Sequence, residues 1–186
     1  MSNPANTASC NTDIHTTRLH LRRFTLEDVG IFYELGSRPE VIRYAHRTPL
    51  QSLEEARERL LAAPLHDYAT RGYGRLLIIE KASSLPIGWC GLKYVDELGE
   101  VDIGYRLLPE FWGKGYALEA CRAVLEHGWP HAGLHRIVAT CMPENARSLR
   151  VLAALGFVYE RRVHLSGDER EYELHALTDH LAGRQS

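Results

Sequence analysis

The stretch from Leu107 to Leu125 constrains the fold of this chain more than any other part of the sequence. It begins Leu-Leu-Pro-Glu-Phe-Trp-Gly-Lys-Gly-Tyr-Ala and continues into an amphipathic segment. This pattern predicts a strand, a short loop containing Gly113 and Gly115, and a long helix. The first N–H groups of a helix have no partner within it, and the helix dipole adds partial positive charge there. Because glycine lets a ligand approach the backbone closely, the loop is a candidate anion site, above all for a phosphate.

Two glycines before a helix also fit an ordinary turn and helix cap, and both interpretations stay open at this point. The loop differs from the common phosphate-binding loops. No Lys-Ser or Lys-Thr pair follows the glycines, as a nucleoside-triphosphate loop requires, and no third glycine stands at dinucleotide spacing. A second constellation strengthens the functional interpretation. A predicted strand at 136–141 is followed by a turn at 142–145 and a predicted helix at 146–155.

Four stretches carry a resemblance to a known family. They are 17–28 (TRLHLRRFTLED), 39–42 (PEVI), 103–117 (IGYRLLPEFWGKGYA), and 145–148 (NARS) together with 155–157 (LGF). In this order and spacing they resemble the GNAT superfamily of N-acetyltransferases, and most closely its Rim-type branch, which includes the ribosomal-protein N-terminal acetyltransferases. The resemblance spans about residues 16 to 178. It implies a single domain whose splayed central strands form a coenzyme A cleft.

Local patterns place the remaining elements and agree with an α+β fold, in which helices flank a mixed, mostly antiparallel sheet. Capping residues at Thr25 and Ser52 and a proline at Pro39 predict helix starts. The predicted strands are 18–23, 75–80, 86–92, 101–108, 136–141, 157–163 and 170–176. The predicted helices cover 25–36, a short segment from 39, 52–63, the segment after the glycine loop, and 146–155. We expect a flexible tail at 1–14, one domain at 15–180 and a second tail at 181–186.

Composition excludes several classes of protein. The net charge is −2, with 45% hydrophobic and 25% charged residues, which is ordinary for a globular domain and gives no basic footprint for nucleic acid. No apolar run is long enough to span a membrane, and no secretion signal is evident. Four widely spaced cysteines (Cys10, Cys90, Cys121, Cys141) favour reduced thiols and a cytoplasmic location.

No metal site is expected. The histidines at 127, 131 and 135 are spaced by four, as a helical metal site would require, but we expect Pro130 and Gly133 to interrupt any helix there.

The resemblance implies acetyl-coenzyme A as cosubstrate. Its pantetheine arm would pair with backbone groups near Leu107 and Leu108, and its pyrophosphate would lie on the N–H groups of the glycine loop. The expected coenzyme-binding residues of the loop are Trp112, Gly113, Lys114, Gly115, Tyr116 and Ala117. Trp112 stands where many relatives have glutamine or arginine. Asn145 is expected to contact coenzyme A, although it could instead cap the helix that follows.

Acetyl transfer from a thioester to an amine needs a deprotonated amine, a donor to the carbonyl oxygen and a proton for the leaving thiolate. Direct attack requires no covalent enzyme intermediate, so the cysteines need no catalytic role. Many relatives have a tyrosine at the position of Leu152 as proton donor. Here leucine cannot serve, and Ser148 lies one turn earlier on the same predicted face. The resemblance makes Ser148 the candidate donor, although a helix serine can also bond its own backbone.

The general base has several candidates. Glu100 and Asp102 precede the glycine loop on its strand, and Glu160 and His164 lie on the strand near 157–163. His164 and Glu160 are the leading candidates, and a water relay without a single base is an alternative.

The predicted function is acetyl-coenzyme-A-dependent transfer to a primary amine, either a small molecule or a protein N-terminus. A non-catalytic sensor of acyl-coenzyme A is the alternative, and the replacement of tyrosine by Leu152 favours it mildly. Acidic residues at 160, 168 and 169 could attract the cationic acceptor. We expect no nucleic-acid or membrane partner, and a homodimer is a further expectation.

Overall fold

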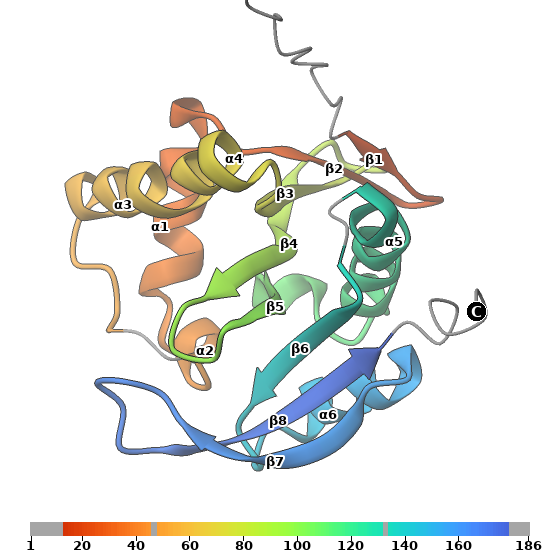
Figure 1. The fold of residues 1–186 in the computed structure, drawn as a ribbon. Helices are drawn as coiled ribbons and strands as arrows, with labels where there is room; N and C mark the ends of the chain where they lie inside the picture. The colour runs from red at the N-terminus through yellow and green to blue at the C-terminus, as the bar shows by residue number, and fades with distance from the viewer. Residues whose placement is uncertain (1–12, 46–47, 132–133, 179–186) are drawn as a thin grey trace, which may run out of the picture.

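One mixed sheet runs through the molecule and carries helices on both faces (Figure 1). The computed structural model describes residues 13–45, 48–131 and 134–178. The strands are β1 Ile14–His15, β2 Leu19–Arg23, β3 Arg75–Glu80, β4 Pro86–Val95, β5 Glu100–Leu107, β6 Arg136–Cys141, β7 Val158–His164 and β8 Glu171–Thr178. The α-helices are α1 Val29–Ser37, α2 Pro39–Ile42, α3 Leu53–Leu60, α4 His66–Arg71, α5 Tyr116–His131 and α6 Ala146–Leu155. The strand order is β1-β2-β3-β4-β5-β6-β8-β7.

The centre of the sheet is where the pairing is weakest. All neighbouring strands pair antiparallel except β5 and β6, which are parallel and pair only at Asp102 and Val138. With a single paired position, the two strands cannot form a continuous ladder and therefore splay apart. The predicted α+β fold, with a mostly antiparallel sheet and splayed central strands, is confirmed.

Two apolar layers hold the helices against the sheet. The larger cluster joins α5 and α6 to one face, with Ala120, Val124 and Leu152 packed against strand residues such as Ile103 and Ile137. On the other face a second cluster combines α1 and α3 with β3 and β4; its buried members are Phe24, Leu35, Leu60, Leu77, Trp89 and Leu108. The helices thus fix β4 and β5 from both sides, next to the point where the sheet opens.

Both predicted helix caps are present. The Thr25 hydroxyl accepts a hydrogen bond from the backbone N–H of Glu27, and the Thr25 N–H donates to Asp28, which closes a capping box. At α3, the Ser52 hydroxyl accepts from the N–H of Glu55 at 3.1 Å. These bonds satisfy N–H groups that a helix start leaves without a partner.

The N-terminal boundary differs from the expected one. Ile14, which we expect in the tail, instead belongs to β1, pairs with Leu21 and is only 4% exposed. Most of the two predicted tails lies outside the described residues.

Two predicted helix ends were wrong. Helix α3 does not stop near Ala63 but continues through a π-helical turn (η2, Leu61–Leu65) into α4. Pro64 lacks the N–H that an α-helical bond requires, and a wider turn accommodates it. Helix α5 likewise continues through Pro130 to His131, because a proline in the last turn removes one bond without preventing the turn from forming. Gly133, the other expected interruption, lies outside the described residues.

Candidate active site

A cavity of about 1510 Å³ opens where β5 and β6 part. It exceeds the few hundred to about 1,000 Å³ of a typical small-molecule site, so it has room for two substrates. Among the predicted site residues, those that line it are Leu107, Trp112, Gly113, Gly115, Tyr116, Ala117, Asn145 and Ser148. Leu108, Lys114, Glu160 and His164 are not among its lining residues.

The glycine loop has the backbone geometry that its sequence predicts. Gly113 and Gly115 have φ angles of +74° and +80°, a left-handed conformation that side chains with a Cβ rarely adopt. Helix α5 starts at Tyr116, and its first intrahelical bond runs from the N–H of Glu119 to the carbonyl of Gly115. The preceding N–H groups at this helix start are therefore available for an anion, next to the cavity.

Arg18 braces the glycine loop from outside the cavity. Its guanidinium donates to the carbonyl of Lys114 at 2.8 Å and to the carboxylate of Glu119 at 2.7 Å, and it lies over the ring of Tyr116. The Tyr116 hydroxyl in turn donates to Glu80. Lys114 itself is exposed, with its Nζ 4.9 Å from the ring centroid of Phe111. The sequence resemblance did not single out Arg18, because its role depends on contacts between segments about a hundred residues apart.

Trp112 fastens the loop to the end of β5. Its indole N–H donates to the carbonyl of Leu107 at 2.8 Å, and the N–H of Leu108 donates to the carbonyl of Ile87 at 2.9 Å. The backbone groups that we expected to pair with pantetheine at 107 and 108 therefore already have protein partners. The Leu107 carbonyl keeps a second lone pair, so pantetheine pairing there stays a prediction.

Asn145 caps helix α6. Its side-chain oxygen accepts from the N–H of Ser148 at 3.2 Å, which is the structural role that the sequence left open. The side-chain NH₂ has no part in this bond, so Asn145 can also reach into the cavity that it lines. Contact with coenzyme A stays a prediction.

Ser148 forms a hydroxyl pair with Tyr105. The two side-chain oxygens are 2.9 Å apart, one on α6 and one on β5, across the splayed strands. Burial raises the pKa of Tyr105 well above its usual value, so the phenol stays protonated. Leu152 is buried in the core at 5% exposure and brings no polar group here. Tyr105 lies within the 103–117 motif, but nothing in the sequence pattern places it opposite Ser148, so the sequence predicts no role for it.

Asp102 lies at the one point where β5 and β6 pair. Its carboxylate accepts from the N–H of Thr140 at 2.9 Å and from the Thr140 hydroxyl at 3.3 Å, so it bridges the two strands where they separate. It lines the cavity. Burial raises its pKa to about 6, although Thr140 and the nearby Arg75 and Lys93 oppose the shift. A carboxyl with a pKa near 6 is ionised at neutral pH but remains basic enough to take a proton.

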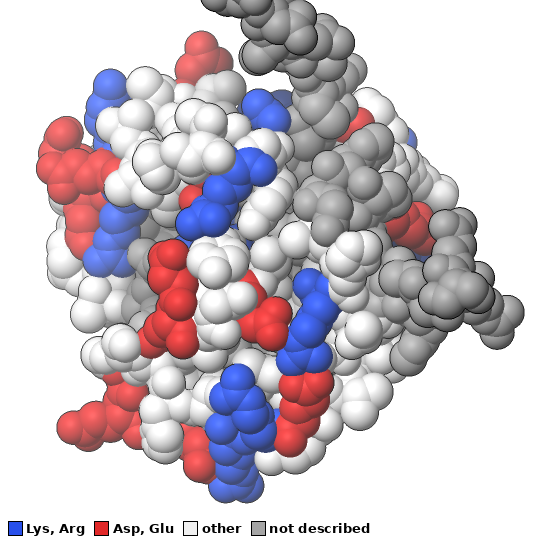
Figure 2. Space-filling model, in the orientation of Figure 1, with Lys and Arg blue, Asp and Glu red and all other residues white. Residues whose placement is uncertain are grey.

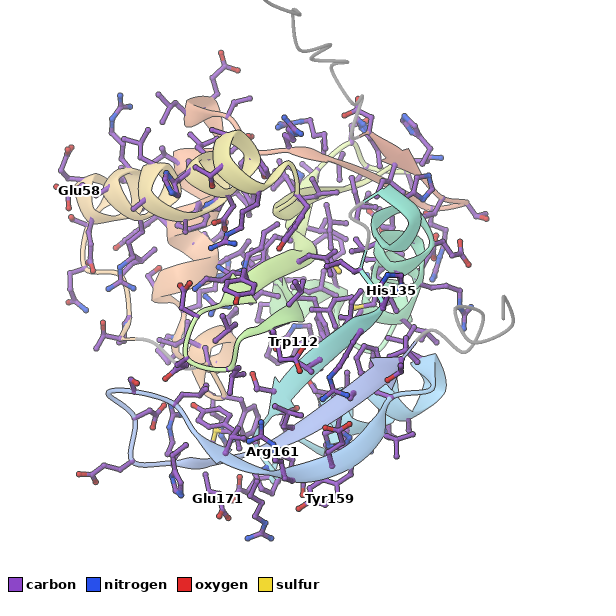
Figure 3. The ribbon with its side chains drawn as sticks, viewed as in Figure 1. Glu58, Trp112, His135, Tyr159, Arg161 and Glu171 are labelled. Atoms are coloured by element: carbon purple, nitrogen blue, oxygen red, sulfur yellow. The ribbon has the colours of Figure 1, made fainter. Side chains whose placement is uncertain are left out.

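Glu160 lies in a different environment. Both of its carboxylate oxygens accept from Arg136 at 2.7 Å, and this bidentate contact lowers the pKa of Glu160. A carboxylate held this way is a weak base. His164 is exposed on the edge strand β7, opposite Glu171 of β8. Figure 3 shows Tyr159 and Arg161 of β7, and Glu171, in the lower part of the view, below Trp112. The structure does not bring Glu160 or His164 together with Ser148.

Cys141 is a buried, free thiol next to the site. Burial raises its pKa to about 12, so it is not a thiolate at neutral pH. Since the thiolate is the nucleophilic form of cysteine, this favours direct attack by the amine over a covalent route.

Arg170 links the loop between β7 and β8 to two residues that line the cavity. Its guanidinium donates to the carbonyls of Arg43 at 3.4 Å and Ala45 at 2.9 Å. Asp168 holds this guanidinium in an ion pair and accepts from the hydroxyl of Tyr172 at 2.6 Å. The acidic residues expected to attract the acceptor are thus already engaged at 160 and 168.

The cavity walls carry more positive than negative side chains. On α6, Arg147 and Arg150 line the side nearest the glycine loop, and Arg147 lies 5.5 Å from the Trp112 ring centroid. The remaining charged lining residues are Glu40, Arg43, Arg59, Arg75, Lys93, Glu97, Asp102, Arg106 and Glu144. Elsewhere on the face in view, acidic and basic side chains alternate without a continuous basic area (Figure 2).

Comparison with known proteins identifies the family. A family model described as an acetyltransferase (GNAT) domain matches residues 18–158. An uncharacterized N-acetyltransferase, p20, of Bacillus licheniformis is 36% identical over 162 residues, which cover 86% of each chain. The chain belongs to the GNAT acetyltransferases. It is therefore an acetyl-coenzyme-A-dependent N-acetyltransferase.

More distant relatives differ in the acceptors that their names state. A spermidine N(1)-acetyltransferase of Vibrio cholerae is 26% identical over 147 residues, covering 77% of this chain and 81% of the relative. RimL, a ribosomal-protein alpha-N-acetyltransferase solved in complex with coenzyme A, superposes with a TM-score of 0.74 at 21% identity, covering 89% of this chain and 97% of that one. The Rim-type proteins are thus structural neighbours of this chain in fold. Among the described residues, no helix is long and apolar enough to cross a membrane.

Proposed function

We propose that this acetyltransferase uses Asp102 as its general base and Ser148, hydrogen-bonded to Tyr105, as the proton donor to the coenzyme A thiolate. The observation that carries the proposal is the environment of Asp102. Asp102 lines the cavity and its pKa is raised to about 6, whereas Arg136 lowers the pKa of Glu160. This assignment replaces Glu160 and His164, which do not line the cavity.

The reaction balances without a covalent enzyme intermediate. The neutral amine attacks the thioester carbonyl carbon, and a C–N bond forms as the carbonyl π electrons move to oxygen. Collapse of this intermediate breaks the C–S bond, and the departing sulfur takes the hydroxyl proton of Ser148. Tyr105 can pass its own proton to Ser148 through their hydrogen bond. Asp102 accepts the amine proton, directly or through a water, because it lies in the same cavity.

Backbone groups would hold the coenzyme. The left-handed Gly113 and Gly115 leave the first N–H groups of α5 open toward the cavity, which suits a pyrophosphate. Arg147 and Arg150 add positive charge on the same side. A β-branched side chain at 115 would be strained at φ +80° and would meet Arg18, 3.4 Å from the added Cβ.

The acceptor that fits this cavity is a monoamine. Away from the glycine loop, cationic lining residues (Arg43, Arg59, Arg75, Lys93, Arg106) outnumber the acidic ones (Glu40, Glu97, Asp102). A polyamine, with a positive charge on each amine, would be repelled there. An N-terminal α-amine, with an unperturbed pKa of about 7.7–8.0, also loses its proton more readily than an alkyl amine near 10.4. We therefore propose a peptide N-terminus or a small monoamine as acceptor.

Two experiments test these proposals. An acceptor screen should show faster thiol release with short peptides bearing free N-termini than with spermidine at equal concentration, and acetylated N-terminal peptides should be inactive. Faster turnover of spermidine than of any peptide or monoamine would overturn the acceptor assignment. Separately, folded Gly115→Val should lose coenzyme A binding by calorimetry, with Gly99→Ala, at another left-handed glycine that does not itself line the cavity, as the control. Unchanged affinity in Gly115→Val would place the coenzyme elsewhere.

A further inference from the structure

The hairpin formed by β1 and β2 carries a cluster of metal-binding side chain types outside the acetyl-transfer cavity. Asp13, His15 and His20 each offer one ligand atom, and these atoms all lie within 4.8 Å of one another. Within the part of the chain that the structure describes, this is the only such group of three or more. None of the three residues lines the cavity.

The strand geometry explains why these side chains converge. His15 and His20 are directly opposite each other in the antiparallel pair, so their side chains point to the same face of the sheet. Their rings stack with centroids 4.3 Å apart and an angle of 7° between the planes, so one ring must turn about its Cβ–Cγ bond for both in-plane nitrogen lone pairs to meet one ion. Asp13 is two residues before His15, which returns its side chain to that face.

The distance between the Asp13 and His20 ligand atoms suits an ion with tetrahedral coordination. The Asp13 carboxylate oxygen Oδ2 and the His20 nitrogen Nε2 are 3.4 Å apart. With metal–ligand distances of about 2.0–2.1 Å, two ligands at a tetrahedral angle lie about 3.3–3.4 Å apart. The same separation is long for a hydrogen bond between these atoms.

A second observation points to a ligand at this place. The Nε2 atom of His20 is buried and has no hydrogen-bond partner. A buried polar atom without a partner costs free energy. Coordination of an ion between His20 and Asp13 would satisfy this nitrogen and use the facing carboxylate.

We propose that Asp13, His15 and His20 form a binding site for one divalent transition-metal ion, with zinc as the ion that best suits the donor set. Two imidazoles and a carboxylate are ligands that zinc accepts in a four-coordinate site, and water completes the fourth position. The ion would cross-link β1, which has only two residues, to its single neighbour β2. This site is independent of the acetyl-transfer cavity, for which no metal is expected.

The cross-link would also fix the turn between the two strands. In that turn the Thr16 hydroxyl donates to Glu119 at 2.6 Å, and the Arg18 guanidinium bonds Glu119 and the Lys114 carbonyl. The Lys81 ammonium donates to the carbonyl of Thr16. Metal binding would therefore stabilise the segment that braces the glycine loop.

Calorimetry with Zn²⁺ and the full-length, metal-stripped protein tests the proposal. We expect one equivalent to bind, and we expect the affinity to fall by more than about tenfold in His20→Ala and in Asp13→Asn. His66→Gln, which removes an exposed histidine on α4, serves as the matched control and should bind zinc like the wild type. With Co²⁺ in place of Zn²⁺, the wild type should show the visible absorption bands of a tetrahedral site, and His20→Ala should lose them.

Thermal unfolding separates loss of the site from loss of the fold. Zn²⁺ should raise the melting temperature of the wild type and of His66→Gln but not that of His20→Ala, which should still show native circular dichroism. Because Asp13 and His15 are exposed, Asp13→Asn should fold even if His20→Ala does not. Zinc binding that persists unchanged in Asp13→Asn, or no binding by the wild type, would overturn the proposal.

Discussion

The junction of β5 and β6 and the edge strand β7 each carry a carboxylate, and the fold gives the two groups opposite chemistry. At the junction, burial raises the pKa of Asp102 to about 6 and its hydrogen bonds come from Thr140. On β7, Arg136 holds both oxygens of Glu160 and lowers its pKa. The difference teaches that the environment of a carboxylate, more than its position in a motif, determines whether it can act as a base.

The same contrast applies to the hydroxyl groups. Ser148 and Tyr105 pair across the splayed strands at the cavity, whereas Tyr159 on β7 is 49% exposed. The splayed centre thus brings a carboxyl of raised pKa and a pair of hydroxyl groups to one cavity. The edge strand presents paired charges to solvent.

The largest effect is expected from Asp102→Asn. If Asp102 is the base, kcat/KM should fall by about 10²- to 10⁴-fold, the range for loss of a general base. In the wild type, kcat/KM should rise with pH through an ionisation at about 6, because the base must be deprotonated, and the variant should lack this limb. Steady-state rates over a pH series measure both. A limb that persists in the variant would assign the ionisation to another group.

Ser148→Ala should lower kcat by about 10- to 1000-fold. The alanine keeps the helix and its Asn145 cap, which uses the backbone N–H of residue 148, so coenzyme A binding should change little. Tyr105→Phe should cause a smaller loss of the same kind, and Tyr159→Phe on β7 is the matched control. Equal kcat in Ser148→Ala and the wild type would remove Ser148 from the mechanism.

Asp102→Asn should also make the protein more stable, but only above about pH 4. The pKa of Asp102 is about 6 in the folded state and 3.8 for a free aspartate, so the folded state holds this proton more tightly than the unfolded state does. As the pH rises from 3.8 to about 6, ionisation of Asp102 therefore lowers the free energy of unfolding. Removing the charge should therefore stabilise the protein progressively from pH 4 to 6, by at most about 3 kcal/mol at 1.36 kcal/mol per pKa unit. Denaturant unfolding at pH 4 and pH 7 measures this. A variant that is less stable at pH 7 would mean that Asp102 mainly holds the two strands together.

The smallest effects are expected on β7. Glu160→Gln and His164→Gln should each change kcat/KM by less than about twofold, because neither residue lines the cavity. Loss of the Glu160 charge leaves Arg136 with its second partner, Glu100, at 2.8 Å. A drop in either variant comparable to that of Asp102→Asn would reverse the comparison between the two regions.

Sequence reasoning was most successful where the chemistry is local. The strand–loop–helix around Gly113 and Gly115, the caps at Thr25 and Ser52, and the helix at 146–155 follow from the residues within each segment, and the structure confirms them. The four motifs, in the order and spacing of the family, also predicted the α+β fold and the acetyltransferase function. The family comparisons confirm that function.

What the sequence could not supply was the contact between distant segments. Arg18 reaches the glycine loop, Tyr105 meets Ser148, and Arg136 neutralises Glu160, each across a long separation in the chain. A single sequence shows the carboxylates but does not show which one lies, half-buried, at the splayed junction.

The contacts of Arg170 have a consequence for how far the splayed sheet can open. Its bonds to the carbonyls of Arg43 and Ala45 join the loop between β7 and β8 to the segment after α2, and both of these partners line the cavity. The β7–β8 hairpin lies on the β6 side of the junction, whereas α2 packs against α1, which contacts β4. Any widening of the gap between the two halves must therefore stretch or break these two bonds.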